Sequence, residues 1–539
     1  MRITKVNIIN YKCFEGKFTI DFHKGINIIV GNNETGKSTI LEAVHLALTG
    51  VINGKYIRNE LNQYLFNNNV VQTYLKSLLE TDKLEPPKII IEVFFSNDLN
   101  PKFEGNNNFE RIVDYGVVFK IELDDDYKQE YETLLKNREG LTALPIEYYK
   151  TSWYSFSQEP MTAKTIPIKS VLIDSSSIRY QNSSDVYIAR IIQNDLDDKE
   201  KVLLSQAYRE MKETFGENKS VININNKIKD KTRITNKMIK ISAELPTQSA
   251  WETALMTFVD DVPFQQIGKG EQCIIKTNLA LSHSKDKEAS LLLLEEPENH
   301  LAYSKMNELV FIIEKYYIDK QIIITTHSSF IANKLDLKNI ILLNRNTIFR
   351  LDKLNEDTYN FFKKLAGYPT LRLLLCKKAV LVEGDSDELI FQKAYYTKHE
   401  RLPIQNGIDV ISVGLSFRRF LEIAIQIKIN VAVITDNDSN YEEKVIKKYK
   451  EYEDCNDIKI FYDTNNELNT LEPQFINVNK DLERLCNVIG IDFNKFNDFD
   501  KINEYMVNHK TAWALKIFET QEEFVFPKYI MNAVDWCDE

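Results

Sequence analysis

The stretch GNNETGKS, Gly31 to Ser38, fits the pattern GxxxxGK[ST]. It follows the apolar run INIIV, which predicts a buried strand, and precedes STILEAVHLALTG, whose apolar residues recur at helical spacing. In such a loop, backbone N–H groups surround a polyphosphate, a lysine reaches the terminal phosphates and a hydroxyl binds Mg²⁺. A chance glycine-rich turn is the alternative, but with only 17 glycines in the chain its probability is below roughly one percent. We therefore expect ATP to bind at Asn32, Asn33, Gly36, Lys37, Ser38 and Thr39.

Three later segments support a nucleotide site. LLLLEEPE places Glu295 and Glu296 after a buried strand, where the first can order Mg²⁺ and the second can activate the attacking water. TTHSS places His327 after the next strand, where an imidazole can sense a γ-phosphate. GKGEQ, with Gly268, Gly270 and Glu271, is expected to precede a helix and present donors to a phosphate. Each segment alone is more often structural, but their order and their positions at strand ends favour function.

The bulk composition bounds the class of protein. A chain of 539 residues with 43% hydrophobic residues predicts a folded protein of two or three domains. No apolar run reaches the roughly 18 residues of a membrane helix, and the N-terminus lacks a signal-peptide core. We therefore expect a soluble, cytoplasmic protein with no membrane contact. The six cysteines form no CxxC pair and the seven histidines no HExxH motif, so a disulfide framework and a zinc site are not expected.

The order of segments predicts an α/β protein with an interrupted first domain. Residues 1–174 carry the GNNETGKS motif, and the highly polar residues 175–245 predict inserted helices that are either a solvated surface or an oligomer contact. Residues 246–352 return to buried strands and complete the first domain. Residues 353–375 are expected to be a linker, and residues 376–539 alternate strand and helix signals as in a parallel sheet with crossover helices.

Two acidic clusters follow apolar runs in the last domain. AVLVEGDSDE places Glu383 at the end of one predicted strand and Asp387 one helical turn later. VAVITDND places Asp436 and Asp438 after another strand, on the same side if the segment is extended. The carboxyl ends of parallel strands meet at one edge, and oxygen-only ligands select Mg²⁺ or Mn²⁺. Two such ions about 4 Å apart serve displacement at a phosphodiester, although an acidic loop is the commoner role of DND alone.

The first domain resembles the ABC-type ATPase heads of the Rad50, SMC and RecF group over roughly residues 1–350. In that group a segment like GKGEQ completes the site of the opposite subunit, so the resemblance implies a homodimer or higher oligomer around ATP. Gly268 stands where the group has a serine, and Glu295 stands where it has an aspartate. Both differences bear on the rate of hydrolysis more than on binding. The net charge of -11 argues against nucleic-acid binding over the whole surface but leaves room for a local basic channel.

AVLVEGDSDE, VISVG and VITDND together resemble a Toprim domain. An ABC-type ATPase head followed by a Toprim domain resembles the OLD (overcoming lysogenization defect) family, which includes the Gabija endonuclease subunit. That resemblance implies metal ligands at Glu383, Asp387, Asp436 and Asp438, with Glu472 as a further candidate. It also implies a catalytic lysine, for which Lys510 in HKTAWAL is the best match and Lys516 the alternative. Asp387 replaces the glutamate common in relatives.

The resemblance implies an ATP-regulated, Mg²⁺- or Mn²⁺-dependent endonuclease acting on double-stranded DNA in antiviral defence, with a helicase-like partner. The alternative from another class is a nucleotide-sensing ATPase scaffold that binds metal without cutting. Topoisomerase or primase activity is a weaker alternative, because no accompanying breakage domain or zinc module is evident in the sequence.

Overall fold

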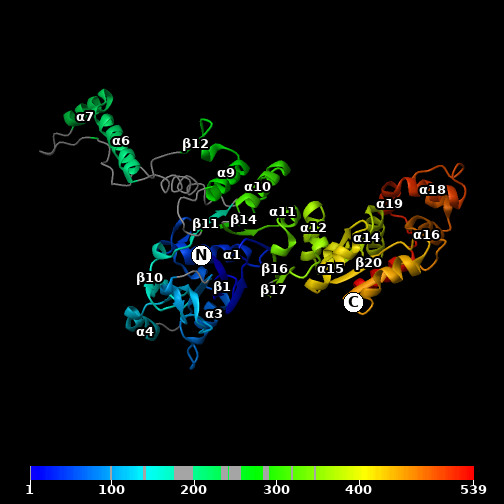
Figure 1. The fold of residues 1–539 in the computed structure, drawn as a ribbon, viewed down its shortest axis with the longest axis horizontal. Helices are drawn as coiled ribbons and strands as arrows, with labels where there is room; N and C mark the ends of the chain where they lie inside the picture. The colour runs from blue at the N-terminus through cyan, green and yellow to red at the C-terminus, as the bar shows by residue number, and fades with distance from the viewer. Residues whose placement is uncertain are drawn as a thin grey trace. The chain divides into compact units, whose positions relative to one another are not determined.

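The computed structural model (Figure 1) describes residues 2–96, 100–137, 141–174, 198–231, 241, 257–282, 290–316, 320–344 and 347–538. The chain divides into two compact units. The first comprises Met1–Asn27 with Gly36–Thr326, and the second comprises Ile28–Thr35 with His327–Glu539. The GNNETGKS motif is therefore divided between the two units at Thr35 and Gly36.

The first unit contains a largely antiparallel sheet with the strand order β10-β9-β8-β6-β1-β2 and the short β7 paired to β8. The bounds are β1 Ile3–Ile9, β2 Lys17–Asp21, β6 Ile89–Phe95, β7 Glu104–Gly105, β8 Asp114–Leu123, β9 Tyr149–Ser155 and β10 Pro160–Met161. The predicted strands IIIEVFF and VVFKIEL are confirmed as β6 and part of β8.

Three strands of the first unit are parallel to one another: β11 Lys169–Asp174, β14 Ser290–Glu295 and β15 Gln321–Thr325. The first two end at acidic residues. β15 is buried along its whole length, which is typical of a strand covered on both faces. The predicted helix after the GNNETGKS loop is α1, Lys37–Thr49, and it ends at Gly50, whose φ of 69° suits a left-handed cap.

The remaining helices of the first unit include two in the predicted insertion, α6 Asp198–Glu217 and α7 Lys219–Lys231, which contact each other (Figure 1). The other residues of 175–245, apart from residues 218 and 241, lie outside the described part of the chain. The further helices and hairpins are α2 Ile57–Glu60, α3 Asn68–Ser77, α4 Lys128–Asn137, α9 Lys269–Ser282, α10 Tyr303–Tyr316, β4 Val51–Ile52, β5 Lys55–Tyr56, β12 Phe258–Val259 and β13 Val262–Pro263.

The second unit begins within β3, Ile26–Gly31, at Ile28, and from there β3 pairs in parallel with β16, Ile340–Asn344. β17, Thr347–Arg350, pairs antiparallel with β16. α11, Ser329–Lys334, follows His327. The expected linker of residues 353–375 contains two helices, α12 Glu356–Lys364 and α13 Thr370–Leu375, whose apolar side chains are buried, so it is a packed part of the unit.

The last part of the chain contains a four-stranded parallel sheet of order β19-β18-β20-β21, as the alternating strand and helix signals predicted. Its strands are β18 Lys378–Val382, β19 Ile408–Ser412, β20 Asn430–Ile434 and β21 Ile458–Phe461. The crossover helices α14, Asp385–His399, and α15, Phe417–Ile427, are confirmed. The third expected helix starts as a π-helix over Glu442–Lys447, a form that often occurs at functional sites.

The helices that follow this sheet are α16 Leu471–Val478, α17 Leu482–Ile489, α18 Phe499–Asn508, α19 Lys510–Glu519 and α20 Lys528–Cys537. One hydrophobic core joins them to α14 and the strands. Trp513 is 1% exposed in that core, and its ring lies 5.3 Å from the ring of Phe475. The core fixes α16 and α19 against the sheet, and so it positions Glu472 and Lys510. The predicted α/β fold class is confirmed. No helix in the described part of the chain is long and apolar enough to cross a membrane.

Candidate functional site

Two neighbouring strands of the C-terminal sheet end in acidic residues at the same edge. β18 and β20 are parallel partners, with Glu383 directly after Val382 and Asp436 two residues after Ile434. Asp387 lies in the first turn of α14, where its Oδ2 accepts a hydrogen bond of 3.0 Å from the Gly384 backbone N–H. The carboxyl edge of a parallel sheet is where α/β proteins bind ligands, so the fold gathers these carboxylates at the expected place.

The carboxylates interact strongly with one another. Burial, together with the charges of Glu383 and Glu472, raises the pKa of Asp387 to about 7 against a hydrogen bond from Gly384 that lowers it. Burial and the charges of Asp387, Glu383 and Glu472 raise the pKa of Asp436 to about 9. Burial and Asp438 raise the pKa of Glu383. A cation placed among these groups would reverse all of these shifts, because it favours the charged form.

Glu472 and Lys510 complete the cluster from two C-terminal helices. The side chain of Glu472 is 2% exposed, and its Oε1 lies 3.9 Å from the Nζ of Lys510, a side chain that is 54% exposed. Its other oxygen, Oε2, is buried without a hydrogen-bond partner among the described residues. Lys516 is held elsewhere, because its Nζ donates a 2.6 Å hydrogen bond to the carbonyl of Ile489. The geometry therefore brings Lys510, and not Lys516, to the carboxylates.

The expected basis for pairing Asp436 with Asp438 is wrong. The extended segment ends at Ile434, and Asp438 has a φ of 47°, so strand alternation does not apply. A turn built around Asn437, which is fully buried, positions both aspartates. The Asn437 amide donates to the carbonyls of Asp463, Asn465 and Leu468 at 3.0, 2.9 and 3.2 Å. Asp438 is exposed and interacts with Glu383.

The donor atoms of the cluster suit a hard divalent cation, although their arrangement does not yet form a coordination site. Within the described ranges, no three His, Cys, Asp or Glu side chains are arranged to hold one metal ion. The donors are nevertheless all carboxylate oxygens, which suit Mg²⁺ or Mn²⁺. The unpartnered Oε2 of Glu472 is a buried anionic oxygen that a cation would satisfy. Glu383, Asp387, Asp436, Asp438 and Glu472 are the residues that would hold such an ion.

Sequence reasoning missed Lys448, which follows the π-helix. Its ammonium interacts with the charges of Glu383 and Asp438, while burial lowers its pKa. The π-helical turn that positions it leaves no clear pattern in the sequence. The motif residue Glu388 interacts with Arg372, because its Oε1 lies 3.8 Å from Nη2 of that arginine.

In the first unit, the predicted nucleotide residues Lys37, Ser38, Glu295 and Glu296 lie together. Burial lowers the pKa of Lys37, which is 6% exposed, against the opposing charges of Glu296, Glu295 and Glu298. Burial raises the pKa of Glu295 to about 7, against a hydrogen bond from Ser38 that lowers it. Ser38 and Glu295 are thus within hydrogen-bonding distance of each other, and their joint binding of Mg²⁺ stays a prediction.

The glycine and threonine that flank Lys37 and Ser38 pack against the turn after β1. Gly36 has a φ of 97°, and a Cβ there would lie 2.6 Å from the Phe14 ring, so the position requires glycine. Thr39 Oγ1 accepts a 3.6 Å contact from Cys13 Sγ. Sequence reasoning did not single out Glu298, whose Oε1 accepts a 2.7 Å hydrogen bond from the Thr326 hydroxyl near the same charges.

The helix that was expected to follow the GKGEQ segment begins inside that segment. α9 begins at Lys269, so only Gly268 precedes the helix and Gly270 is inside it. A Cβ at Gly270 would lie 2.6 Å from the carbonyl oxygen of His300, which explains the second glycine by close backbone approach. Glu271 is 3.4 Å from Lys305 in an exposed ion pair. Asn32, Asn33 and His327 belong to the second unit and are exposed.

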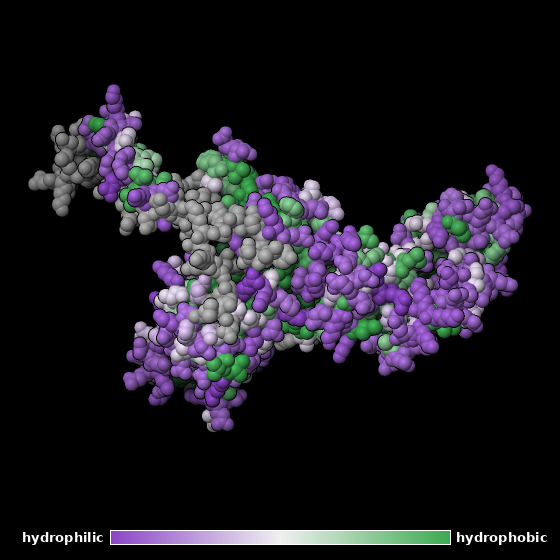
Figure 2. Space-filling view, viewed as in Figure 1, coloured by the Kyte–Doolittle hydropathy of each residue, from purple (hydrophilic) through white to green (hydrophobic). Residues whose placement is uncertain are grey.

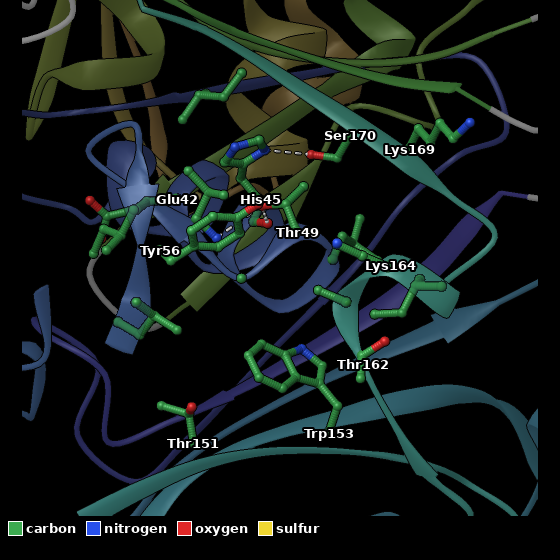
Figure 3. Close-up of a pocket in the computed structure, with 18 of the residues that line it drawn as sticks. Glu42, His45, Thr49, Tyr56, Thr151, Trp153, Thr162, Lys164, Lys169 and Ser170 are labelled. Atoms are coloured by element: carbon green, nitrogen blue, oxygen red, sulfur yellow. Dashed lines mark hydrogen bonds between the residues drawn. The ribbon is translucent and has the colours of Figure 1, made fainter. Parts of the chain in front are cut away.

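A cavity of about 1130 Å³ lies in the first unit beside the distal half of α1 (Figure 3). Its wall includes His45, whose Nδ1 lies 2.8 Å from the Ser170 hydroxyl, and Trp153, whose Nε1 donates to the Ala47 carbonyl at 2.9 Å. Lys37 and Ser38 do not line it, so it is distinct from the nucleotide residues.

Comparisons with known proteins match two segments of the chain to family models. Residues 1–332 match the family model of an AAA ATPase domain. Residues 374–438 match that of an overcoming lysogenization defect protein-like TOPRIM domain.

Among curated relatives, the DNA replication and repair protein RecF of Alkaliphilus oremlandii is 31% identical over 75 residues, which are 14% of this chain and 19% of that protein. A structural maintenance of chromosomes protein 3 homolog of Plasmodium falciparum is 29% identical over 113 residues, 19% of this chain and 9% of that protein. The chain thus spans less than a fifth of the length of either relative.

Among solved structures, an SMC head bound to the C-winged helix domain of ScpA is 15% identical with a TM-score of 0.34. The match covers 66% of this chain and 99% of that structure's chain. The C-terminal region of the Xanthomonas campestris pv. campestris OLD protein is 20% identical with a TM-score of 0.25, covering 30% of this chain and 93% of its own. Because the ATPase match covers more than half of the 539 residues, the chain belongs to the AAA ATPase domain family, and it carries an OLD-like Toprim domain after that region.

Proposed function

We propose that the protein is a divalent-metal-dependent DNA endonuclease whose cutting is controlled by ATP. The observation that carries the proposal is the convergence of five carboxylates and Lys510 at the carboxyl edge of the Toprim sheet. A family match to an OLD-like Toprim domain over residues 374–438, which include Glu383, Asp387, Asp436 and Asp438, supports it. The proposed substrate is double-stranded DNA, and the proposed setting is antiviral defence of the Gabija type.

The residues of the cluster have separate roles in this proposal. A bound Mg²⁺ or Mn²⁺ would activate water and stabilise the leaving oxygen at a phosphodiester. Glu383, Asp387, Asp436, Asp438 and Oε2 of Glu472 would hold the ion, and Oε1 of Glu472 would orient Lys510. Lys510 is exposed enough to reach a phosphate, where its charge would stabilise the extra negative charge of the transition state.

ATP binding and dimerisation are proposed for the first unit. Lys37, Ser38 and Glu295 would bind ATP with Mg²⁺, and Glu296 would activate water for hydrolysis. Large apolar side chains are exposed on α10 and on the β12–β13 hairpin, near the GKGEQ helix (Figure 2). They include Phe311, which is 68% exposed, and Phe258, which is 57% exposed. Exposed apolar patches favour a protein interface, which supports a homodimer or higher oligomer. A helicase-like partner is proposed from the OLD-family resemblance alone.

A nucleotide-sensing scaffold that does not cut is the second candidate. The observation that favours it is that no ready three-ligand metal arrangement exists in the described residues. The two candidates differ in one measurable property, which is metal-dependent cleavage.

The test is incubation of the full chain with supercoiled and linear DNA, with Mg²⁺ or Mn²⁺, and with or without ATP. Glu383→Ala and Asp436→Ala are expected to abolish cleavage and to leave ATP binding intact. Asp385→Ala is the matched control, because Asp385 is an exposed acid of the same motif. Intact DNA under every condition, or cleavage by both variants at the wild-type rate, would reject the metal site.

A further inference from the structure

The short helix α13 joins the nucleotide loop to the Toprim sheet within the second unit. At its end, the carbonyl of Leu375 accepts a 3.2 Å hydrogen bond from Nδ2 of Asn32, a residue of the GNNETGKS motif. At its start, the Leu371 backbone N–H donates a 3.3 Å hydrogen bond to the hydroxyl of Ser329, the first residue of α11. α11 begins two residues after His327, so both partners of α13 adjoin predicted nucleotide-sensing residues.

A second group of contacts ties α13 to α11. The Thr370 hydroxyl, fully buried, donates a 2.6 Å hydrogen bond to Oδ1 of Asn333. Nδ2 of Asn333 donates to the carbonyls of Ala366 and Tyr368 at 3.1 and 2.9 Å. Asn333 is itself fully buried, and breaking such buried hydrogen bonds is costly. α11 and α13 are therefore expected to move together.

Arg372, in the middle of α13, holds the Toprim side. Its Nε and Nη2 donate to the two carboxylate oxygens of Asp409 at 3.0 and 2.6 Å, and Nη2 also donates to the Val410 carbonyl at 2.8 Å. Asp409 is 8% exposed and lies on β19. Nη2 is also 3.8 Å from Oε1 of Glu388, the residue next to Asp387. A bidentate guanidinium fixes both distance and orientation.

We propose that Arg372 is a positioning residue that links the nucleotide loop to the carboxylate cluster. A shift of the Gly31–Thr35 loop or of α11 on nucleotide binding would move α13, and Arg372 would pass that movement to β19 and the first turn of α14. That turn contains Asp387, so the position of a metal ligand would depend on the nucleotide. The inference rests on the proposed function and specifies how its cutting site is regulated.

The alternative is that the Arg372–Asp409 pair only fastens α13 to the sheet. In that case Arg372 variants would change stability but would not alter any response to nucleotide. The test therefore measures a nucleotide response that does not require cleavage.

Hydrogen exchange of the amides at 384–388 would be measured in the full chain with Mg²⁺, with and without a non-hydrolysable ATP analogue. In the wild type, nucleotide is expected to change the exchange rates by about fivefold, the low end of typical allosteric coupling. Arg372→Lys keeps the charge but loses the bidentate fork, so it is expected to lose that change while binding a fluorescent ATP analogue normally.

Arg484→Lys is the matched control, because Arg484, on α17, donates from Nε to Glu522 at 2.7 Å and from Nη2 to the Glu523 carbonyl at 2.8 Å, and neither contact involves α13. It is expected to respond to nucleotide like the wild type. Ser329→Ala removes only the hydroxyl bonded to Leu371, so it serves as a milder variant if Arg372→Lys does not fold, and a reduced response is expected.

An unchanged nucleotide response in Arg372→Lys, or in Ser329→Ala if only that variant folds, would overturn the inference. The absence of any response in the wild type would also overturn it. Because exchange is measured without DNA, a nucleotide response in a protein that does not cut DNA would reject the nuclease assignment and retain the coupling role of Arg372.

Discussion

Replacing Asp387 by asparagine is expected to stabilise the metal-free protein at alkaline pH. Burial is the main reason that the Asp387 pKa rises from 3.8 to about 7, and the charges of Glu383 and Glu472 add to it. Since the folded-state pKa lies above the unfolded value, the protonated form favours folding. That contribution is complete below pH 4 and is lost as the pH rises through 7. An asparagine carries no charge, is similar in size and can still accept the Gly384 hydrogen bond.

The size of the effect follows from the shift. A rise of about 3 pKa units corresponds to about 4 kcal/mol as an upper limit. Neighbouring carboxylates share protons with Asp387, so a gain on the order of 2 kcal/mol is a better expectation. For a domain of this size, such a gain raises the melting temperature by roughly 4–8 °C. Nearly the full gain should be present at pH 8.5, and less of it at pH 5.5.

The assay is thermal unfolding of the full chain, followed by circular dichroism in EDTA and in Mg²⁺ across this pH range. Asp385→Asn is the control, because it makes the same charge change at an exposed position of the same helical turn. Mg²⁺ should raise the melting temperature of the wild type more than that of Asp387→Asn, since ligand binding stabilises the folded state. A variant that melts below the wild type at pH 8.5 in EDTA, or a control with the same gain, would refute the reasoning.

Three further outcomes are expected. Asn437→Ala should lower the melting temperature and weaken Mn²⁺ binding measured by calorimetry. Asn479→Ala, which loses three side-chain hydrogen bonds to Phe475 and Val525, should lower stability alone. Lys510→Ala should lose DNA cleavage at an unchanged melting temperature. Lys516→Ala should keep DNA cleavage and have a lower melting temperature. Equal effects of the two variants in both assays would contradict the assignment. Binding of ATP with Mg²⁺ should strengthen between pH 6 and 8, because Glu295 of the metal-free protein, whose pKa burial raises to about 7, loses its proton over that range, and Glu295→Gln should abolish that strengthening.

Local patterns in the sequence predicted most of the elements that build both sites. The runs before Gly31 and Glu383 are buried strands, and the loops after them open helices, because strand and helix periodicity are local properties. The same reasoning failed at Asp438, because strand alternation was extended past the end of β20. It also treated residues 353–375 as a linker, since two helices of nine and six residues give only a short periodic signal.

Long-range contacts were beyond what the sequence could indicate. Asn437 stood between two aspartates as an ordinary turn residue, yet its amide binds three carbonyls some 26 to 31 positions away. Arg372 lay in the expected linker, and its partner Asp409 follows 37 positions later. The choice between Lys510 and Lys516 likewise depended on α19 packing, which turns the first toward Glu472 and the second toward Ile489.

The carboxylates of the cluster lie farther from a cationic side chain than three paired acids of the same domain do. Asp409 has Arg372 at 2.6 Å, Glu522 has Arg484 at 2.7 Å and Asp535 has Lys398 at 2.8 Å. Within the described residues, the nearest ion pair in the cluster is Lys510 to Glu472 at 3.9 Å. The structural acids thus have a cationic side chain close by, whereas the five carboxylates at the carboxyl edge of the sheet have only distant lysines. Their repulsion destabilises the folded state unless a cation from solution binds there. The metal-free protein should therefore gain more stability from Mg²⁺ than Asp436→Asn does, and equal gains would mean that the cluster is only an acidic surface.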